Sequence, residues 1–315
     1  MPTFSRIDAL LLVMTLIWGT NFSIVKSAFR EMEPQAFNAV RLLLASVVFL
    51  ITMRLVPGTP HGVDGDEAAS VFHTPAPLTR TDWLGLAALG VVGHCLYQFC
   101  FINGLARTSV ANASLMLAAT PVLIAIMTAL LGQDRIAPLH WVGAALSMAG
   151  IYIVVGRGFD VTNGTVYGDL LMAGAVLCWA SYTVGARYLM RRHSPVGVTG
   201  LSMAIGAALY VPFSAGALSR VAWRTISLHT WLALVYSALF ALCIAYTIWY
   251  AAVRAIGSAR TSVYSNVVPI VAMAVAVVWL GEPLTASKLT GAAAVLVGVT
   301  LTRAGRRRLP IPAEP

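Results

Sequence analysis

Long apolar runs follow one another along the whole chain, separated by short polar connections. A helix needs about 20 mostly apolar residues to cross a hydrocarbon core about 30 Å thick. Ten runs approach this length and predict ten membrane-spanning helices. We place them at about residues 8–26, 36–54, 83–104, 110–131, 139–155, 169–189, 196–214, 230–252, 260–280 and 286–302. The pattern therefore predicts an all-α membrane protein that crosses the bilayer many times.

The composition excludes other classes of protein. Of the 315 residues, 58% are hydrophobic and only 10% are charged, whereas a soluble domain carries about 25% charged residues. The mean hydropathy of +0.80 also excludes a disordered chain, because disordered chains are poor in apolar residues. The chain lacks the charge to cover a water-facing surface. We therefore expect the lipid bilayer to be its main surroundings.

The basic residues predict the orientation. If the N-terminus is cytoplasmic, 13 Lys and Arg residues lie in inner segments and 7 in outer ones, while Arg41 falls within a span. Basic residues gather in cytoplasmic segments, so both termini and the Pro/Gly-rich loop 55–82 are predicted inside. We expect a multi-pass protein of the inner (plasma) membrane. The net charge of +9 is then explained without a nucleic-acid partner.

The sequence gives no sign of an enzyme. Its four cysteines lie in apolar runs without a C-x-x-C pair, so neither a disulfide framework nor a metal site is expected. The H-E-x-x-H, G-x-S-x-G and P-loop motifs do not occur. We therefore expect no catalytic residues and no cofactor.

The two halves of the chain resemble each other. Four residues match at an offset of 161, namely Asp8, Trp18, Lys26 and Pro34 with Asp169, Trp179, Arg187 and Pro195. Four more match at an offset of 148, namely Trp83, Pro121, Gly143 and Gly150 with Trp231, Pro269, Gly291 and Gly298. A longer loop 55–82 accounts for the difference. We predict two five-helix repeats, 1–157 and 158–315.

Five is an odd number, so the second repeat would enter the membrane from the opposite side. Inverted repeats of this kind let a protein exchange outward-open and inward-open states, with a binding site near the midplane between the repeats. The alternative is a duplication that only enlarged a helix bundle.

The sequence also resembles the drug/metabolite transporter superfamily, EamA type, over nearly its whole length. The motifs that carry the resemblance are Ile17 to Phe22, Arg41 to Ala45, Leu115 to Pro121 with Leu131-Gly132, Val263 to Pro269 with Leu280 to Glu282, Gly143 to Gly150 and Gly291 to Gly298. The family often has Glu after Gly in both halves, whereas the first copy here has Gln133, so the first half lacks that acid. The resemblance implies a ten-helix transporter, often an exporter of amino acids or related metabolites.

Arg41 is the charged residue that lies well inside a predicted span rather than near its end. It follows Pro34 by seven residues, which places it about 10 Å into the helix. An uncompensated charge at this depth is costly, so we expect it to face the bundle interior or water. One role is contact with the carboxylate of a substrate, and Asn38 lies on the same helix face. The alternative is an arginine that extends to the membrane surface or binds helix-end carbonyl groups.

Other polar and aromatic residues recur at helical spacing within the runs. Together with Arg41, we predict that they line a central cavity: Trp18, Asn21, Asn38, His94, Gln98, Trp179, Tyr182, Tyr246, Tyr250 and Asn266. Aromatic walls with a few amide and hydroxyl groups suit a small organic solute. The alternative is hydrogen bonding between helices and anchoring at the membrane surface. His94 could carry a coupling proton, or stay neutral and hydrogen-bonded.

These observations favour a secondary transporter, and an exporter in particular, of a small organic metabolite such as an amino acid. The alternatives are a membrane-embedded enzyme or lipid flippase that uses the same cavity, and a structural membrane subunit. Missing catalytic motifs count against the enzyme. We expect a monomer or a weak dimer.

Overall fold

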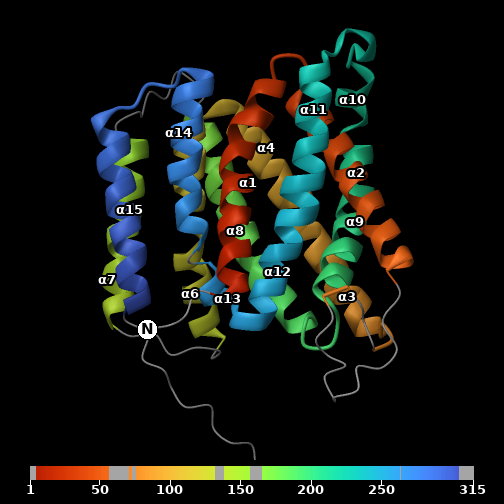
Figure 1. The fold of residues 1–315 in the computed structure, drawn as a ribbon, viewed down its shortest axis with the longest axis horizontal. Coiled ribbons are helices and arrows are strands. Elements are labelled where there is room, and N and C mark those ends of the chain that lie inside the picture. Colours follow the sequence, from red (N-terminus) through yellow and green to blue (C-terminus); the bar gives the residue numbers. More distant parts are fainter. Residues whose placement is uncertain are drawn as a thin grey trace, which may run out of the picture.

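The structure, a computed structural model, describes residues 5–56, 71–72, 76–131, 138–156, 165–262 and 264–304. Throughout these ranges the regular elements are helical, without a strand (Figure 1). In the first part of the chain they are α1 (Arg6–Ala28), α2 (Pro34–Leu55), α3 (Arg80–Leu89), η1 (Gly90–Leu96), α4 (Tyr97–Arg107), α5 (Val110–Leu117), α6 (Thr120–Leu130) and α7 (Pro138–Gly156). The second part contains α8 (Thr165–Leu189), α9 (Pro195–Phe213), α10 (Ala215–Ser219), η3 (Trp223–Thr225), α11 (Leu228–Tyr236), η4 (Ser237–Ile244), α12 (Ala245–Ile256), α13 (Ser258–Thr261), η5 (Tyr264–Val267), α14 (Val268–Leu280) and α15 (Ala286–Ala304).

The predicted apolar runs fall on these helical segments. Among the described residues, seven helices are long and apolar enough to cross a membrane, and shorter apolar helices cover Tyr264–Leu280 and Ala286–Gly298. The prediction of a helical membrane protein is confirmed to this extent. Most of loop 55–82, the repeat boundary at 157 and 158, and Gln133 lie outside the described residues.

Local sequence signals set where the helices begin. Ser5 and Asp8 form a capping box at the start of α1, and Thr79 and Asp82 form another at the start of α3. In each box the hydroxyl accepts the N–H of the third helical residue while the carboxylate accepts the N–H of the capping residue, which satisfies two otherwise unpaired donors. Pro34 begins α2 at a position where no backbone donor is needed.

Two of the long helices are continuous but widen in the middle. The π-helical segment η1 joins α3 to α4, and the π-helical segment η4 joins α11 to α12. Such segments are rare and often mark functional sites, because the wider turn displaces side chains and frees backbone carbonyl groups. The hydrophobic pattern of the sequence did not predict these segments, because a single π turn does not change the residue composition of a helix.

Two other predicted spans are broken rather than continuous. The run 110–131 divides into α5 and α6 with a break at Ala118 and Ala119, and α14 is preceded by the short helices α13 and η5. Pro121 and Pro269 lie at the start of the second pieces, α6 and α14. Proline removes a backbone donor and cannot continue the preceding turn, so each proline accounts for a break.

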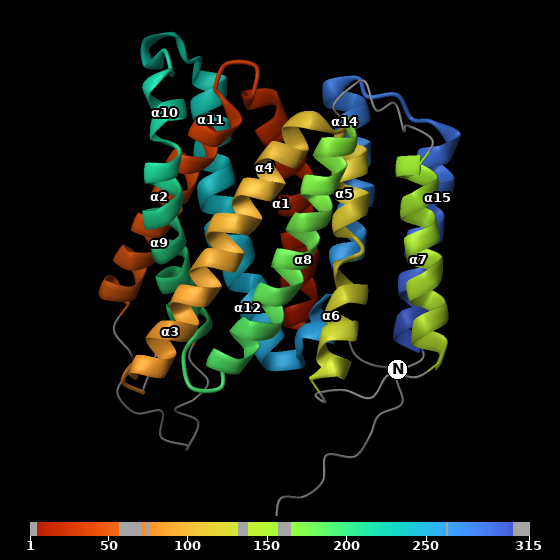
Figure 2. The same ribbon diagram turned by 180° about the vertical axis from the view of Figure 1, so that it is seen from behind.

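The helices form a bundle from which one pair stands apart. Helices α7 and α15 lie side by side at one end of the molecule, while α1, α4, α8 and α12 occupy the centre (Figures 1 and 2). Contacting pairs in the main body include α4 with α8, α1 with α14, α2 with α9, and α9 with η1. The carboxylate of Glu31, in the loop after α1, accepts the N–H of Ser227 at 2.9 Å and the hydroxyl of Thr230 at 2.8 Å. The backbone hydrogen bond from Ser227 is the main reason that the pKa of Glu31 is lowered.

Candidate functional site

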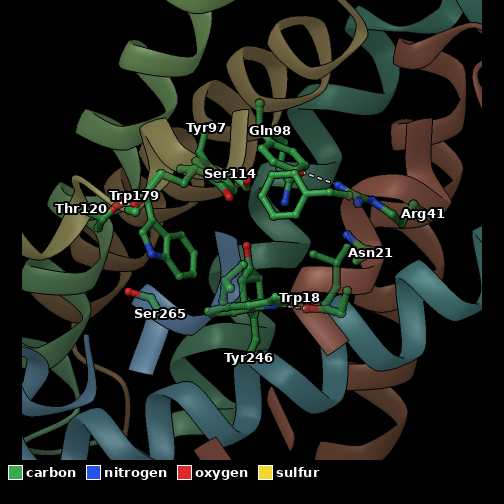
Figure 3. Close-up of a pocket in the computed structure, with 17 residues that line it drawn as sticks. Trp18, Asn21, Arg41, Tyr97, Gln98, Ser114, Thr120, Trp179, Tyr246 and Ser265 are labelled. Atoms are coloured by element: carbon green, nitrogen blue, oxygen red, sulfur yellow. Dashed lines mark hydrogen bonds between the residues drawn. The ribbon is translucent and has the colours of Figure 1, made fainter. Parts of the chain in front are cut away.

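A cavity lies in the centre of the main body, between helices from both parts of the chain (Figure 3). Its volume is about 670 Å³ with the open space at its mouth included. Its wall is formed by Trp18, Asn21, Phe22, Arg41, Tyr97, Gln98, Phe101, Ser114, Leu117, Ala118, Thr120, Trp179, Ala241, Leu242, Tyr246, Ser265 and Val268. The wall is mostly apolar with a few polar groups, which is typical of a site for a small organic molecule.

Arg41 is the charged residue of this wall. Its side chain is 1% exposed, and its guanidinium donates to Ser237 Oγ at 2.9 Å and to Gln98 Oε1 at 2.6 Å. It also donates to Asn38 Oδ1 at 2.6 Å, so α2, α4 and η4 all hold it in place. The expectation that Arg41 faces the interior is confirmed, and extension to the membrane surface is excluded by its burial.

These partners of Arg41 are all neutral. In the described part of the chain no carboxylate forms an ion pair with it, and its Nε has no hydrogen-bond partner there. A buried charge without a counterion is costly, and neutral hydrogen bonds recover only part of that cost. The wall therefore presents a fixed positive charge to anything that occupies the cavity.

Aromatic rings form a large part of the cavity wall. The rings of Trp179 and Tyr246 stack with centroids 5.2 Å apart, and Trp18 meets Trp179 edge-on at 5.7 Å. Tyr97 lies 5.2 Å from Trp179, and Trp249 packs behind Trp18 at 5.3 Å. Offset and edge-on arrangements of this kind are the favoured ones, so the rings form a rigid apolar surface.

The π-helical segment η4 contributes to both sides of the cavity. Its first residue, Ser237, accepts a hydrogen bond from Arg41, and the carbonyl of Ala241 accepts the indole N–H of Trp18 at 3.0 Å. Ala241 and Leu242 also line the cavity. One widened turn thus holds both the charged group and one aromatic ring of the cavity wall.

Both broken spans reach the cavity. Ser114, Ala118 and Thr120 line it from the α5–α6 break, and Ser265 and Val268 line it from the η5–α14 junction. Broken helices in membrane proteins are tolerated where they border a cavity, and transporters use them to build binding sites.

The structure brings six of the eleven predicted site residues to the cavity wall, and these are Trp18, Asn21, Arg41, Gln98, Trp179 and Tyr246. The other five are buried, but the wall does not include them: Asn38, His94, Tyr182, Tyr250 and Asn266. Asn38 supports Arg41 from behind, and Tyr250 lies 6.1 Å from the ring of Trp179.

His94 does not line the cavity, although its ring meets that of the wall residue Tyr246 edge-on at 5.9 Å. Its Nε2 is 3.0 Å from the hydroxyl of Tyr182, which is in turn 3.0 Å from the hydroxyl of Ser202. The wall residues that our prediction omitted are mainly apolar, such as Phe22, Phe101 and Leu117. No sequence signal distinguishes them from ordinary core residues.

The described residues show no group of three or more His, Cys, Asp or Glu side chains that could hold a metal ion. What the cavity offers is a fixed cation, several amide and hydroxyl groups, and a rigid aromatic surface. This arrangement can bind an amphipathic organic molecule. The fold and the site together define a multi-pass helical membrane protein with a central cavity.

Comparison with known proteins identifies the family. The model of the EamA-like transporter family matches residues 5–156 and 166–304, so the chain belongs to this family. It is 27% identical to the uncharacterized transporter YyaM of Bacillus subtilis, over 97% of this chain and 95% of that protein. It is also 27% identical to a probable amino-acid metabolite efflux pump of Salmonella typhimurium, over 96% of this chain and 97% of that protein. A crystal structure of a protein with 21% sequence identity shares the fold, with a TM-score of 0.68 over 97% of this chain and 100% of that chain.

Proposed function

We propose that this protein is a secondary transporter that exports a small organic metabolite with a carboxylate, such as an amino acid or its derivative. The observation that carries the proposal is Arg41, a buried cation on the cavity wall whose partners among the described residues are all neutral. Intramembrane charges of this kind usually mark a substrate or ion path. The Salmonella typhimurium relative is named a probable amino-acid metabolite efflux pump, which supports amino-acid-related cargo and the outward direction.

In this proposal the cargo spans the cavity. Its carboxylate accepts hydrogen bonds from the guanidinium of Arg41, whose planar group suits bidentate recognition. Its apolar part lies against the rings of Trp179 and Tyr246. Asn21, Gln98 and Ser114 are available for the remaining polar groups of the cargo.

The mechanism we propose is alternating access by ten spans in two inverted repeats, 1–157 and 158–315, in the plasma membrane with both termini inside. Three observations support it. The family model matches in two stretches that divide between residues 156 and 166. The π-helical segments begin at Gly90 and Ser237. Pro121 and Pro269, the prolines of the two broken spans, are separated by nearly the same number of residues as the starts of the two π-helical segments.

Transport by the purified protein in proteoliposomes tests the proposal. The panel contains amino acids, the corresponding hydroxy acids, and the carboxamide of each compound as a matched control that lacks the charge. We expect uptake of some of the acids, and at least about tenfold weaker binding of the matching amides, as for loss of a charge-assisted hydrogen bond. Comparison with and without a pH gradient shows whether protons are coupled. Equal transport of acids and amides would contradict the proposal, as would lipid scrambling without solute uptake.

A further inference from the structure

A polar cluster lies at the end of the bundle where α1 finishes and α5 begins. Figure 2 shows the helices that meet at this end. The side chains that form it, which we call the latch, are Lys26, Thr108, Asp169, Glu282 and Lys288. They come from α1, the α4–α5 connection, the first turns of α8, the end of α14 and the start of α15. The latch therefore joins segments from both parts of the chain.

Glu282 is the centre of the latch. Its carboxylate accepts the backbone N–H of Val110 at 2.8 Å and lies 3.4 Å from the N–H of Ala111. It is 3.6 Å from Nζ of Lys288 and 3.9 Å from Nζ of Lys26. A carboxylate at the start of a helix is favoured by the unpaired N–H groups and by the helix dipole, so Glu282 holds α5 by charge as well as by hydrogen bonds.

The remaining contacts extend the latch toward α8. Lys26 donates a hydrogen bond to the carbonyl of Thr108, and the hydroxyl of Thr108 donates to Asp169 at 2.7 Å. Two cations and two carboxylates are thus brought together, so the cluster carries little net charge. Thr108 and Asp169 are buried, although both lie near the end of the bundle.

The chain is shaped to place Glu282. Gly281 has a φ of +67°, a left-handed conformation that glycine adopts without strain, and it ends α14. The N–H of Glu282 then donates to the carbonyl of Ala276 at 3.2 Å. This turn sends the chain back over α14 and brings the carboxylate to the start of α5.

The latch lies directly beyond the cavity. Lys26 is four residues after Phe22 on α1, and Val110 is four residues before Ser114 on α5. Phe22 and Ser114 both line the cavity. Four residues of helix span about 6 Å, so one helical turn separates the latch from the cavity on each of these helices.

We infer that the latch is the gate that seals the cavity from this side of the membrane. It must open whenever the cavity faces this side, because α5 both lines the cavity and is held at its first turn by Glu282. This inference rests on the proposed alternating access and adds to it the residues that close one face. Under the proposed orientation this face is the outer one.

Solvent access to the cavity tests the inference without any substrate. Ser114→Cys is introduced after the four native cysteines are replaced by alanine, and its reaction with a membrane-impermeant maleimide is followed in intact cells and in inverted vesicles. We expect Glu282→Gln to raise the labelling rate about tenfold from the latch side, as expected for loss of a charge-assisted contact. Glu33→Gln is the matched control, because Glu33 forms an exposed ion pair with Arg220 and does not contact α5. We expect this control to leave the labelling rate unchanged.

A second experiment covers the case in which Glu282→Gln does not fold. Lys26→Cys and Glu282→Cys are combined and joined by a short, reducible thiol cross-linker, which should hold the gate shut and abolish the transport that the double variant retains, and reduction of the cross-linker should restore that transport. Labelling that does not rise in folded Glu282→Gln, or transport that continues after cross-linking, would overturn the gate. Lack of transport by the unmodified protein, with labelling that still responds to Glu282→Gln, would instead contradict only the proposed function.

Discussion

The contact of α2 with η4 and the contact of α9 with η1 are built from the same kinds of element. Each brings a helix that begins with proline, Pro34 or Pro195, against a π-helical segment. The offsets of 161 and 148 relate the two helices and the two segments, so we regard the contacts as equivalent under the proposed repeat. The chemistry of the two contacts has nevertheless diverged.

The α2–η4 contact contains a charged residue and borders the cavity. Arg41 lies between Asn38 and Ser237 and borders the cavity. At an offset of 161, the residues that correspond to Asn38 and Arg41 are Thr199 and Ser202. At the α9–η1 contact these residues support a neutral chain in which His94 meets Tyr182 and Tyr182 meets Ser202.

The α9–η1 contact is also closely packed. A Cβ atom added at Gly206 of α9 would lie 2.7 Å from the carbonyl oxygen of Gly90 in η1 and would also meet His94. Such a distance is too short for carbon and oxygen atoms that are not bonded. If the proposed repeat and the proposed substrate contact both hold, the same backbone arrangement serves ligand recognition on one side and close packing on the other.

Substitution of Arg41 is expected to have the largest effect, and it tests whether the two contacts really differ in function. We predict that Arg41→Gln nearly abolishes uptake and weakens substrate binding by at least ~1.5 kcal/mol, the lower range for a hydrogen bond to a charged group. Arg41→Lys keeps the charge but loses the planar group, so we expect weaker binding of a carboxylate. Uptake in proteoliposomes and a direct binding measurement check both variants.

Arg54→Gln is the matched control for Arg41→Gln, because Arg54 is an exposed arginine in the last turn of the same helix. We expect this control to transport normally. If Arg41→Gln transports normally as well, or loses activity only because it is no longer monodisperse, the charge on the α2–η4 side is structural and the contrast between the two contacts disappears.

The second prediction concerns the packing of the α9–η1 contact. We expect Gly206→Ala to lower the stability of the protein by about 1–3 kcal/mol, because a methyl group there forces α9 and η1 apart. Gly216→Ala is the control, since the nearest atom to an added Cβ there is a guanidinium nitrogen of Arg220 at 3.6 Å. Melting temperatures in detergent compare the two variants. A Gly206→Ala protein as stable as the control would show that the contact has room to move.

The comparison also shows what sequence could predict. Apolar run lengths located the helices, and a lone charge within a run identified Arg41 as an interior residue. The spacing of His94 and Gln98 predicted a shared face, which holds for a regular α-helix. In the structure Gln98 lines the cavity and accepts a hydrogen bond from Arg41, whereas His94 does not line the cavity and contacts Tyr182.

Other features of the site depend on residues far apart in the chain. The partners of Arg41 include Gln98 and Ser237, which lie 57 and 196 residues away. No local pattern in the sequence signals these contacts. Only the packing of α2 against α4 and η4 brings them together.

The third prediction distinguishes the two roles considered for His94. His94→Phe keeps a ring of similar shape but removes the hydrogen bond to Tyr182, so we expect a loss of about 1 kcal/mol in stability. Transport, and any dependence of transport on a pH gradient, should be unchanged because His94 does not border the cavity. Uptake driven by a pH gradient that disappears in His94→Phe would instead assign the coupling proton to the α9–η1 side.

The smallest effect is expected for a pair of serine variants. Ser237→Ala removes one of the three hydrogen bonds that hold Arg41, so the guanidinium gains freedom and substrate binding should weaken by about 0.5–1.5 kcal/mol. Ser202→Ala removes the serine contact of Tyr182 on the other side, and we expect it to lower stability by a similar amount without changing affinity. Substrate binding and melting temperature are measured for both variants. If Ser202→Ala weakens binding as much as Ser237→Ala does, the two contacts act as one unit, and recognition is not confined to the α2–η4 side.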